Sequence, residues 1–482
     1  MRITYFLLLL LPPLALVLWL PQGAAQDLPD LGDNSQATFS ALEEKRLGEN
    51  IMHDIRRDLS FNDDPELADY LNTLGYRLVA VSADARQEFE FFIIRDATLN
   101  AFAMPGGYIG VHTGLIMAAQ SESELAGVLA HEIAHVTQRH LARQISNQSQ
   151  LSTMALAGLA LALVASRVSS EAGQVAAMST QAGAVAAQLN FSRDFEREAD
   201  RTGFQTLQRA NFNVQGMAAF FERLQKNSRL AESNAPAYLR THPLSGERVA
   251  DMQNRVKDEA YRQVPDSVDF QLVRAKLRAE QGSAHDAVVY FEESLRERRF
   301  ATEFAARYGY AVALARAREF PRAEREIATL RAQGRLPTMV VALSARVKRD
   351  AGDAAAARAT LREALVQNPD NRPLNYAYIE MQQAGGLHQE ALDGISVMLR
   401  GHPDDARLYG MQARSYAALG RRLLQHQAQA QLYILQGRLS AAIEQLEMAQ
   451  KGGDGDFYQM SGVDARLREL RAKLQAESRK KP

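Results

Sequence analysis

The sequence predicts a mostly α-helical chain in two parts, an α+β domain with a small β-meander followed by an all-α solenoid of helical repeats. A stretch dense in aromatic and β-branched residues, 89–95, interrupts helical patterning in the first half. The second half is rich in Ala, Leu and Arg and repeats a Gly-x4-Ala pattern about every 34 residues. At 482 residues the chain is also too long for a single ordinary core.

Residues 1–25 are expected to be a cleaved export signal peptide. Arg2 precedes an apolar run over 5–20, and small residues follow at 22–26. We expect cleavage after Ala25, and an uncleaved membrane anchor is the alternative for such a run. Residues 26–40 are polar and predict a flexible leader.

Charge and cysteine content narrow the function classes. Lys+Arg 56 balance Asp+Glu 57, and no basic stripe interleaved with aromatic residues is present, so no nucleic-acid partner is predicted. The chain has no cysteine, which excludes disulfides, thiol catalysis and thiolate ligands. Any chemistry must therefore come from His, Glu, Asp and hydroxyl side chains.

The β-meander is predicted from three short strands. They lie at 89–95, 100–103 and 108–113, with the turn Pro105-Gly-Gly107 between the last two. An extended peptide can add to an exposed sheet edge through main-chain hydrogen bonds. The edge residues predicted to receive such a substrate are Asn100, Ala101, Phe102 and Ala103, and an internal structural hairpin is the alternative.

A helix is predicted directly after the strands, because Ser121 and Glu124 have the spacing of a capping box. This helix carries His131-Glu-Ile-Ala-His135. Two histidines four apart share one helix face, so both can present a ring nitrogen to one ion. Glu132 can reach a water on that ion, whose pKa zinc lowers to near 7, so the spacing predicts zinc-dependent hydrolysis with Glu132 as base.

A third ligand is needed, and Glu196 and Asp200 share one helix face further along the chain. One helix could therefore supply a zinc carboxylate and a second carboxylate for a ligating imidazole, although a solvated helix face is the alternative. His140 is rejected as a ligand. It lies nine positions after His131, on the opposite side of a continuing helix, where we expect an exposed polar residue.

His242, directly before Pro243, is the remaining candidate for the site. It could donate a hydrogen bond to the oxyanion during turnover. It could instead be a fourth zinc ligand that displaces water and holds the enzyme inactive. A loop histidine that stabilises the turn before Pro243 is the third interpretation, and the sequence leaves all three open.

An unbroken apolar stretch, Met154–Ala165, lies between the two motifs. It is well short of the roughly 20 residues that span a bilayer, so we expect a buried or surface-docked helix hairpin within 151–188. Peripheral membrane contact and a lid are the alternatives.

The repeat after residue 266 has the period of the tetratricopeptide helix-turn-helix unit. Its anchors lie at 282, 318, 352 and 386, with Arg318 in place of a glycine. A further anchor at Gly437 is one and a half periods on, with Gly420 as the half-step. Stacked repeats present a concave surface suited to binding peptides or partner proteins.

The pattern His131-Glu-x-x-His135 followed by Glu196-x-x-x-Asp200 resembles the gluzincin metallopeptidases related to the CAAX prenyl protease and HtpX. With the export signal and the repeats, the chain resembles the periplasmic beta-barrel assembly-enhancing protease family. The resemblance implies one Zn²⁺ bound by His131, His135 and Glu196, with Glu132 as base. It also implies that Asp200 does not bind the metal and instead contacts a ligating imidazole. We predict a zincin-like metallopeptidase domain over 41–262 and a tetratricopeptide domain over 266–482.

The resemblance also implies a function in the periplasm, in outer-membrane protein assembly and quality control. The expected activity is that of an endopeptidase, with chaperone-like activity, that degrades misassembled or unfolded outer-membrane proteins. The solenoid would recruit these proteins or their assembly machinery. The alternative is a chaperone or scaffold in which the solenoid does the main work and proteolysis is normally repressed.

Overall fold

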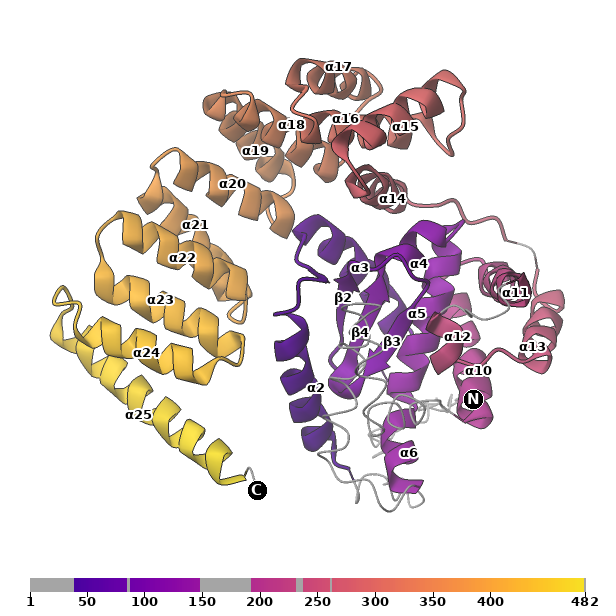
Figure 1. Cartoon of the computed structure of the whole chain (residues 1–482), viewed down its shortest axis with the longest axis horizontal. Coiled ribbons are helices and arrows are strands. Elements are labelled where there is room, and N and C mark those ends of the chain that lie inside the picture. Colours follow the sequence, from indigo (N-terminus) through magenta and orange to yellow (C-terminus); the bar gives the residue numbers. More distant parts are fainter. Residues whose placement is uncertain (1–38, 85–86, 148–191, 231–236, 261, 481–482) are drawn as a thin grey trace, which may run out of the picture.

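The computed structural model describes residues 39–84, 87–147, 192–230, 237–260 and 262–480 (Figure 1). The predicted signal peptide, the leader up to residue 38 and the apolar stretch 154–165 lie outside the described residues. Within the described ranges, no helix is both long enough and apolar enough to cross a bilayer.

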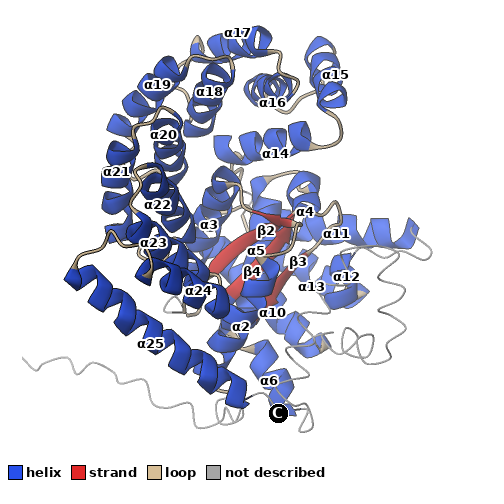
Figure 2. Ribbon diagram, turned by 60° about the vertical axis from the view of Figure 1, so that its left-hand side comes forward, coloured by secondary structure: helices blue, strands red, loops and turns tan. Residues whose placement is uncertain are grey.

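The first part of the chain combines a small sheet with helices on both of its faces (Figure 2). Its elements are α2 (Ala41–Ile55), β1 (Phe61–Asn62), α3 (Pro65–Val79), β2 (Glu90–Ile94), β3 (Ala101–Met104), η1 (Pro105–Gly107), β4 (Tyr108–His112), α4 (Thr113–Ala118), α5 (Glu122–Thr137), α6 (His140–Asn147), α10 (Arg193–Arg209), α11 (Gln215–Leu230), α12 (Ala237–Thr241) and α13 (Gly246–Lys257).

The strand order β1-β2-β4-β3 in the described part of the chain corrects the predicted β-meander. β3 and β4 form an antiparallel hairpin, but β2 and β4 pair in parallel. A meander would pair β2 with β3, its neighbour in sequence. β4 is buried from Ile109 to His112 and takes the inner position, which leaves β3 at the edge of the sheet, as predicted.

Burial of both sheet faces explains the unbroken apolar run in β2. Phe92 and Ile94 pack against α2, whereas Phe91 and Ile93 belong to the larger core that contains α3 and α5. Neighbouring residues in a strand point to opposite faces. A strand covered on both sides therefore has apolar residues at consecutive positions.

α5 is the central helix of this part. The Ser121 hydroxyl caps its first turn by accepting from the Glu124 N–H, and every residue from Glu122 to Val136 is buried. α10 packs closely against it at Gly203, where a Cβ would lie 3.0 Å from the backbone nitrogen of His131. The helix that carries the histidine pair therefore lies inside the core.

The second part is a solenoid of paired helices that arcs around the sheet-containing part (Figure 1). Its elements are α14 (Val268–Glu280), α15 (Ala284–Arg296), α16 (Glu303–Arg316), α17 (Phe320–Arg331), α18 (Thr338–Asp350), α19 (Ala354–Gln367), α20 (Arg372–Ala384), α21 (His388–Gly401), α22 (Ala406–Ala418), α23 (Arg422–Leu435), α24 (Leu439–Gln450) and α25 (Phe457–Lys480).

The predicted anchors are the left-handed turns between paired helices. Positive φ angles occur at Gly282, Arg318, Gly352 and Gly386. Gly420, one full period after Gly386, forms the next such turn between α22 and α23. Gly437 follows half a period later and joins α23 to α24. The predicted roles of these last two glycines were wrong: the period continues to Gly420, and Gly437 is the half-step.

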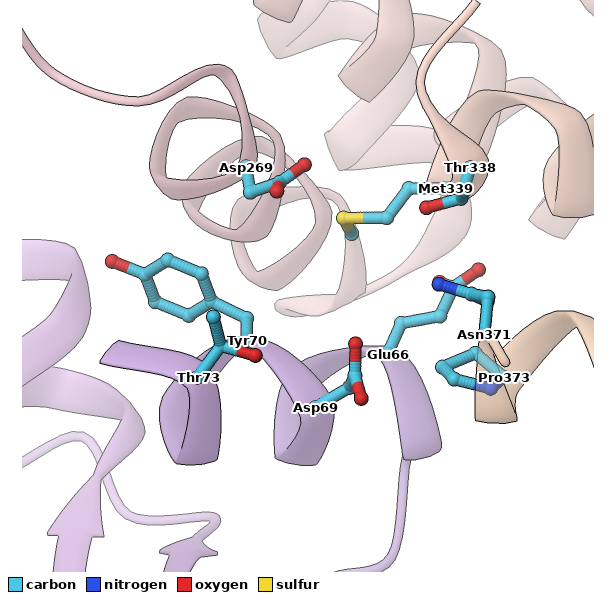
Figure 3. Close-up of a pocket in the computed structure, with 9 residues that line it drawn as sticks. All are labelled: Glu66, Asp69, Tyr70, Thr73, Asp269, Thr338, Met339, Asn371 and Pro373. Atoms are coloured by element: carbon cyan, nitrogen blue, oxygen red, sulfur yellow. The ribbon is translucent and has the colours of Figure 1, made fainter. Parts of the chain in front are cut away.

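The solenoid contacts the first part at α3, through α14 and α20. The buried Lys276 Nζ lies 2.5 Å from both Asp64 Oδ2 and Glu66 Oε2. A cavity of about 100 Å³ lies at this junction. In Figure 3, side chains of α3 face Asp269 of α14 across it.

A second link joins the solenoid to α5 itself. The Glu122 carboxylate accepts hydrogen bonds from the Tyr70 hydroxyl at 3.0 Å and from the Ser267 hydroxyl at 2.7 Å. Ser267 is the N-cap of α14. The helix with the histidine pair is therefore tied at its first residue to the first repeat helix.

Candidate metal centre

Among the described residues, His131, His135, Glu196 and His242 bring their side chains together and could hold a metal ion. The histidine pair comes from α5, Glu196 from α10, and His242 directly follows α12. One nitrogen or oxygen from each lies within 4.8 Å of the others, and all four side chains are buried. The structure thus brings the motif at His131–His135 and the motif at Glu196–Asp200, which are far apart in the sequence, to one place.

Several of the distances between these atoms are close to those in a tetrahedral metal site. His131 Nε2 lies 3.0 Å from His135 Nε2, 3.5 Å from Glu196 Oε2 and 3.4 Å from His242 Nδ1. Glu196 Oε1 lies 3.4 Å from His135 Nε2 and 2.9 Å from His242 Nδ1. Zinc bound at about 2.0–2.1 Å in a tetrahedron separates its ligand atoms by about 3.3–3.4 Å.

The charges around the cluster favour a cation. Burial by itself lowers the pKa of His131, but interactions with Asp200 and Glu196 outweigh burial and raise the pKa to about 10. Burial raises the pKa of Glu196, yet His242, His131 and His135 hold that pKa well below its usual value. A fully buried imidazole with a raised pKa means that the neighbouring carboxylates stabilise positive charge at this position.

Asp200 contacts the ring nitrogen of His131 that is turned away from the cluster. Its Oδ1 is 3.0 Å from His131 Nδ1, which leaves Nε2 of that ring facing the cluster. A carboxylate in this position fixes the tautomer and the orientation of a metal-binding imidazole.

Arg248 is a residue of the site that the sequence motifs did not indicate. Its guanidinium donates to both oxygens of Asp200, at 2.7 and 2.8 Å, and Nη1 lies 2.7 Å from Glu196 Oε2. Nη1 also donates to the Pro243 carbonyl at 2.7 Å, next to His242. Charge balance could have indicated such a residue. Glu132, Glu196 and Asp200 around one divalent cation leave a net negative charge, and a buried negative charge needs a further cation beside it.

Glu132 is fully buried beside the cluster. In the part of the chain that the structure describes, neither of its carboxylate oxygens accepts a hydrogen bond. The Nε2 atom of His242 lies 3.5 Å from Glu132 Oε1. A buried carboxylate with free lone pairs is able to accept a proton from a water molecule at the cluster.

His140 is buried, which contradicts the predicted exposed position. α5 ends at Thr137, and Arg139 turns the chain with a φ of 51°, while its guanidinium donates to the Phe39 carbonyl at 2.9 Å. His140 therefore starts α6 and folds back, with its Nδ1 2.9 Å from His135 Nδ1. The prediction assumed a continuing helix, whereas a contact with a distant segment holds the turn.

The edge strand β3 runs beside α5. Asn100, Ala101 and Phe102 are buried and Ala103 is half-buried. The His112 N–H donates to the Asn100 carbonyl, and backbone groups alternate in direction along an antiparallel strand. The N–H and C=O groups of Ala101 and Ala103 therefore point to the outer side, where the Tyr238 N–H already binds the Leu99 carbonyl at 3.1 Å.

Comparisons with known proteins agree with both parts of the chain. Residues 65–256 match peptidase family M48, and residues 348–415 match a tetratricopeptide repeat. The beta-barrel assembly-enhancing protease of Escherichia coli is 32% identical over 467 residues, which cover 95% of this chain and 93% of that protein. The putative beta-barrel assembly-enhancing protease of Vibrio cholerae is 39% identical over 300 residues, 62% of each chain. The mitochondrial metalloendopeptidase OMA1 of Schizosaccharomyces pombe is 33% identical over 181 residues, which cover 37% of this chain and 50% of that protein.

A metallopeptidase match that spans both motifs, together with the buried His and Glu cluster, makes this chain a zinc metalloprotease. It belongs to the beta-barrel assembly-enhancing protease family. The predicted fold class, enzyme class and zinc dependence are confirmed.

Proposed function

We propose that this chain is a periplasmic endopeptidase that degrades misassembled or unfolded outer-membrane proteins during their assembly. Two observations support the proposal. Relatives over 95% of the chain are named for enhancing beta-barrel assembly, and the segment 1–25 has the composition of an export signal. The predicted metallopeptidase domain over 41–262 supplies the hydrolysis, and the tetratricopeptide domain over 266–482 recruits substrates or the assembly machinery.

The proposed zinc ligands are His131, His135 and Glu196, and the convergence of their ligand atoms carries this proposal. When bound, zinc acidifies water and polarises the scissile carbonyl. Glu132 takes the proton from the attacking water and returns it to the leaving amine. Asp200 holds His131 in the tautomer with Nε2 directed to the cluster.

The substrate is proposed to bind as an extended strand on the outer side of β3. The outward backbone groups of Ala101 and Ala103 supply hydrogen bonds that do not depend on side-chain identity. Strand addition needs no free chain terminus, which favours cleavage within a chain and weak sequence preference. Asn100 and Phe102 direct their backbone to β4 and hold the edge in place.

His242 is proposed as a fourth ligand in the resting enzyme. Its Nδ1 faces the cluster, and the Tyr238 ring stacks on it with centroids 4.7 Å apart. Catalytic zinc sites keep one position open for water or substrate, whereas four protein ligands are typical of structural sites. Displacement of the loop at Pro243 is therefore required for turnover.

An arrangement in which His242 occupies the fourth ligand position favours one second function. The chain would then be a tetratricopeptide chaperone or scaffold for outer-membrane assembly whose proteolysis is normally repressed. The same four-residue cluster supports this function, because His242 would block the water site.

Replacing His242 by alanine is expected to raise the rate of peptide hydrolysis, by about tenfold if about one molecule in ten is open at rest. The measurement is kcat/KM on an unfolded protein substrate, with exposed His402→Ala in the solenoid as the control histidine. A fall in rate would instead assign His242 the role of an oxyanion donor. An unchanged rate would exclude both roles.

The test of the proposed function is zinc content measured together with degradation of an unfolded outer-membrane protein. We expect one zinc per chain in the wild type, and loss of both zinc and degradation in Glu196→Ala. Degradation by a wild-type enzyme without zinc would contradict the proposed ligands. Zinc binding without any degradation, also in His242→Ala, would favour the scaffold.

A further inference from the structure

We propose that His140 and Glu198 form a relay that positions the ligand His135. The His135–His140–Glu198 relay rests on the zinc ligands proposed above, and it adds two residues to them. Neither His140 nor Glu198 has an atom in the four-residue cluster. Both act through another side chain and are positioning residues.

The relay is a continuous series of close contacts that starts in the core. His135 Nδ1 lies 2.9 Å from His140 Nδ1, and His140 Nε2 lies 3.3 Å from Glu198 Oε2. Both imidazoles are buried, whereas the Glu198 side chain is 24% exposed. Arg143 Nη1 donates to the same Glu198 oxygen at 3.0 Å, so the outer end of the relay is anchored.

The positions of the protons on the two rings follow from which atom of His135 faces the cluster. That atom is Nε2, which lies 3.0 Å from His131 Nε2 and 3.4 Å from Glu196 Oε1. A neutral imidazole that binds metal through Nε2 carries its proton on Nδ1. His135 therefore donates to His140 Nδ1, and His140 carries its own proton on Nε2, directed to Glu198.

The two zinc-binding histidines are thus supported by two different arrangements. A carboxylate contacts His131 directly, through Asp200 at 3.0 Å. On the Nδ1 side of His135, a carboxylate is reached through a second ring, because His140 lies between His135 and Glu198. The carboxylates of both arrangements come from α10, where Glu196 and Asp200 share one face and Glu198, between them, points to the other side. Partners of this kind orient the ligand ring and raise its basicity.

The plane of the His140 ring is set by packing that does not involve its nitrogens. Phe195 stacks on it with ring centroids 4.6 Å apart and an interplanar angle of 15°. The Arg143 guanidinium lies over the Phe195 ring at 4.7 Å. A phenylalanine at position 140 would keep the stack and the volume, and it would remove the hydrogen bond to His135 and the contact with Glu198.

The experiment measures zinc affinity by chelator competition and the visible absorption of the Co²⁺-substituted enzyme. We expect His140→Phe to weaken zinc binding by about 10- to 100-fold and to change the Co²⁺ spectrum. Glu198→Gln, which keeps the shape of the side chain, should weaken binding in the same direction and less. His140→Asn should recover part of the affinity lost in His140→Phe, because its side-chain oxygen can accept from His135 Nδ1.

The matched control is Asp194→Asn, which makes the same change from carboxylate to amide on α10. Asp194 pairs with Arg197 at the surface and is 86% exposed. The Asp194→Asn variant should therefore have the zinc affinity and the Co²⁺ spectrum of the wild type.

Two results would overturn the relay: wild-type affinity and spectrum in both His140→Phe and Glu198→Gln, or equal losses in His140→Asn and His140→Phe. Failure of the zinc ligands would look different. In that case His135→Ala itself would bind zinc as tightly as the wild type.

Discussion

Replacing Glu132 by glutamine is expected to slow peptide hydrolysis by about 100- to 10,000-fold, the usual contribution of a positioned general base. The amide keeps the shape of the buried side chain and cannot take a proton from water. Zinc should stay bound, because the Glu132 oxygens are not among the ligand atoms of the cluster. The measurement is kcat/KM on an unfolded outer-membrane protein, together with the zinc content of the same preparation.

The same variant separates the two proposed functions. If cells with Glu132→Gln lose the biological activity together with hydrolysis, the enzyme function is supported. Full biological activity without hydrolysis would favour the chaperone or scaffold. A hydrolysis rate within tenfold of the wild type would show that Glu132 is not the base.

Replacing Arg248 by methionine is expected to destabilise the zinc-free fold by about 3–5 kcal/mol, the usual cost of leaving a buried charge unpaired. Arg248 is 3% exposed, and its guanidinium lies next to both Asp200 and Glu196. Saturating zinc should reduce the loss, because the positive charge of the metal then offsets the same carboxylates. Denaturant unfolding with and without zinc measures both values.

The control for Arg248 is Arg255→Met, also in α13. Arg255 pairs with Asp251 at 2.8 Å and the pair is partly exposed, at 34% and 48%. Such pairs contribute at most about 1 kcal/mol, so this variant should be close to the wild type. A loss below about 1 kcal/mol in Arg248→Met would mean that Arg248 does not compensate the buried carboxylates.

Arg248 also connects stability to the proposed closure by His242. Its bond to the Pro243 carbonyl holds the loop that carries His242. The zinc-loaded Arg248→Met enzyme should therefore open more often than the wild type. This expectation agrees with the proposed rise in activity of His242→Ala, because both changes release the fourth position.

Local spacing predicted much of the site and the repeats. The pairs His131 and His135, and Glu196 and Asp200, lie on common helix faces because the α-helix repeats every 3.6 residues. The capping residue Ser121 and the left-handed turns at Gly282 and Gly352 depend on a few neighbouring residues in the same way. Each of these features is set by backbone geometry over one or two turns.

By itself, the sequence thus determined the helix faces, the repeat period and the zinc motif. Only the tertiary structure decided that β4 lies between β2 and β3, that His140 turns back to His135, and that Arg248 joins the carboxylates to the His242 loop. These features depend on contacts between segments far apart in the chain. Burial and charge compensation select such contacts only when the whole core is assembled, so short-range periodicity carries no signal for them.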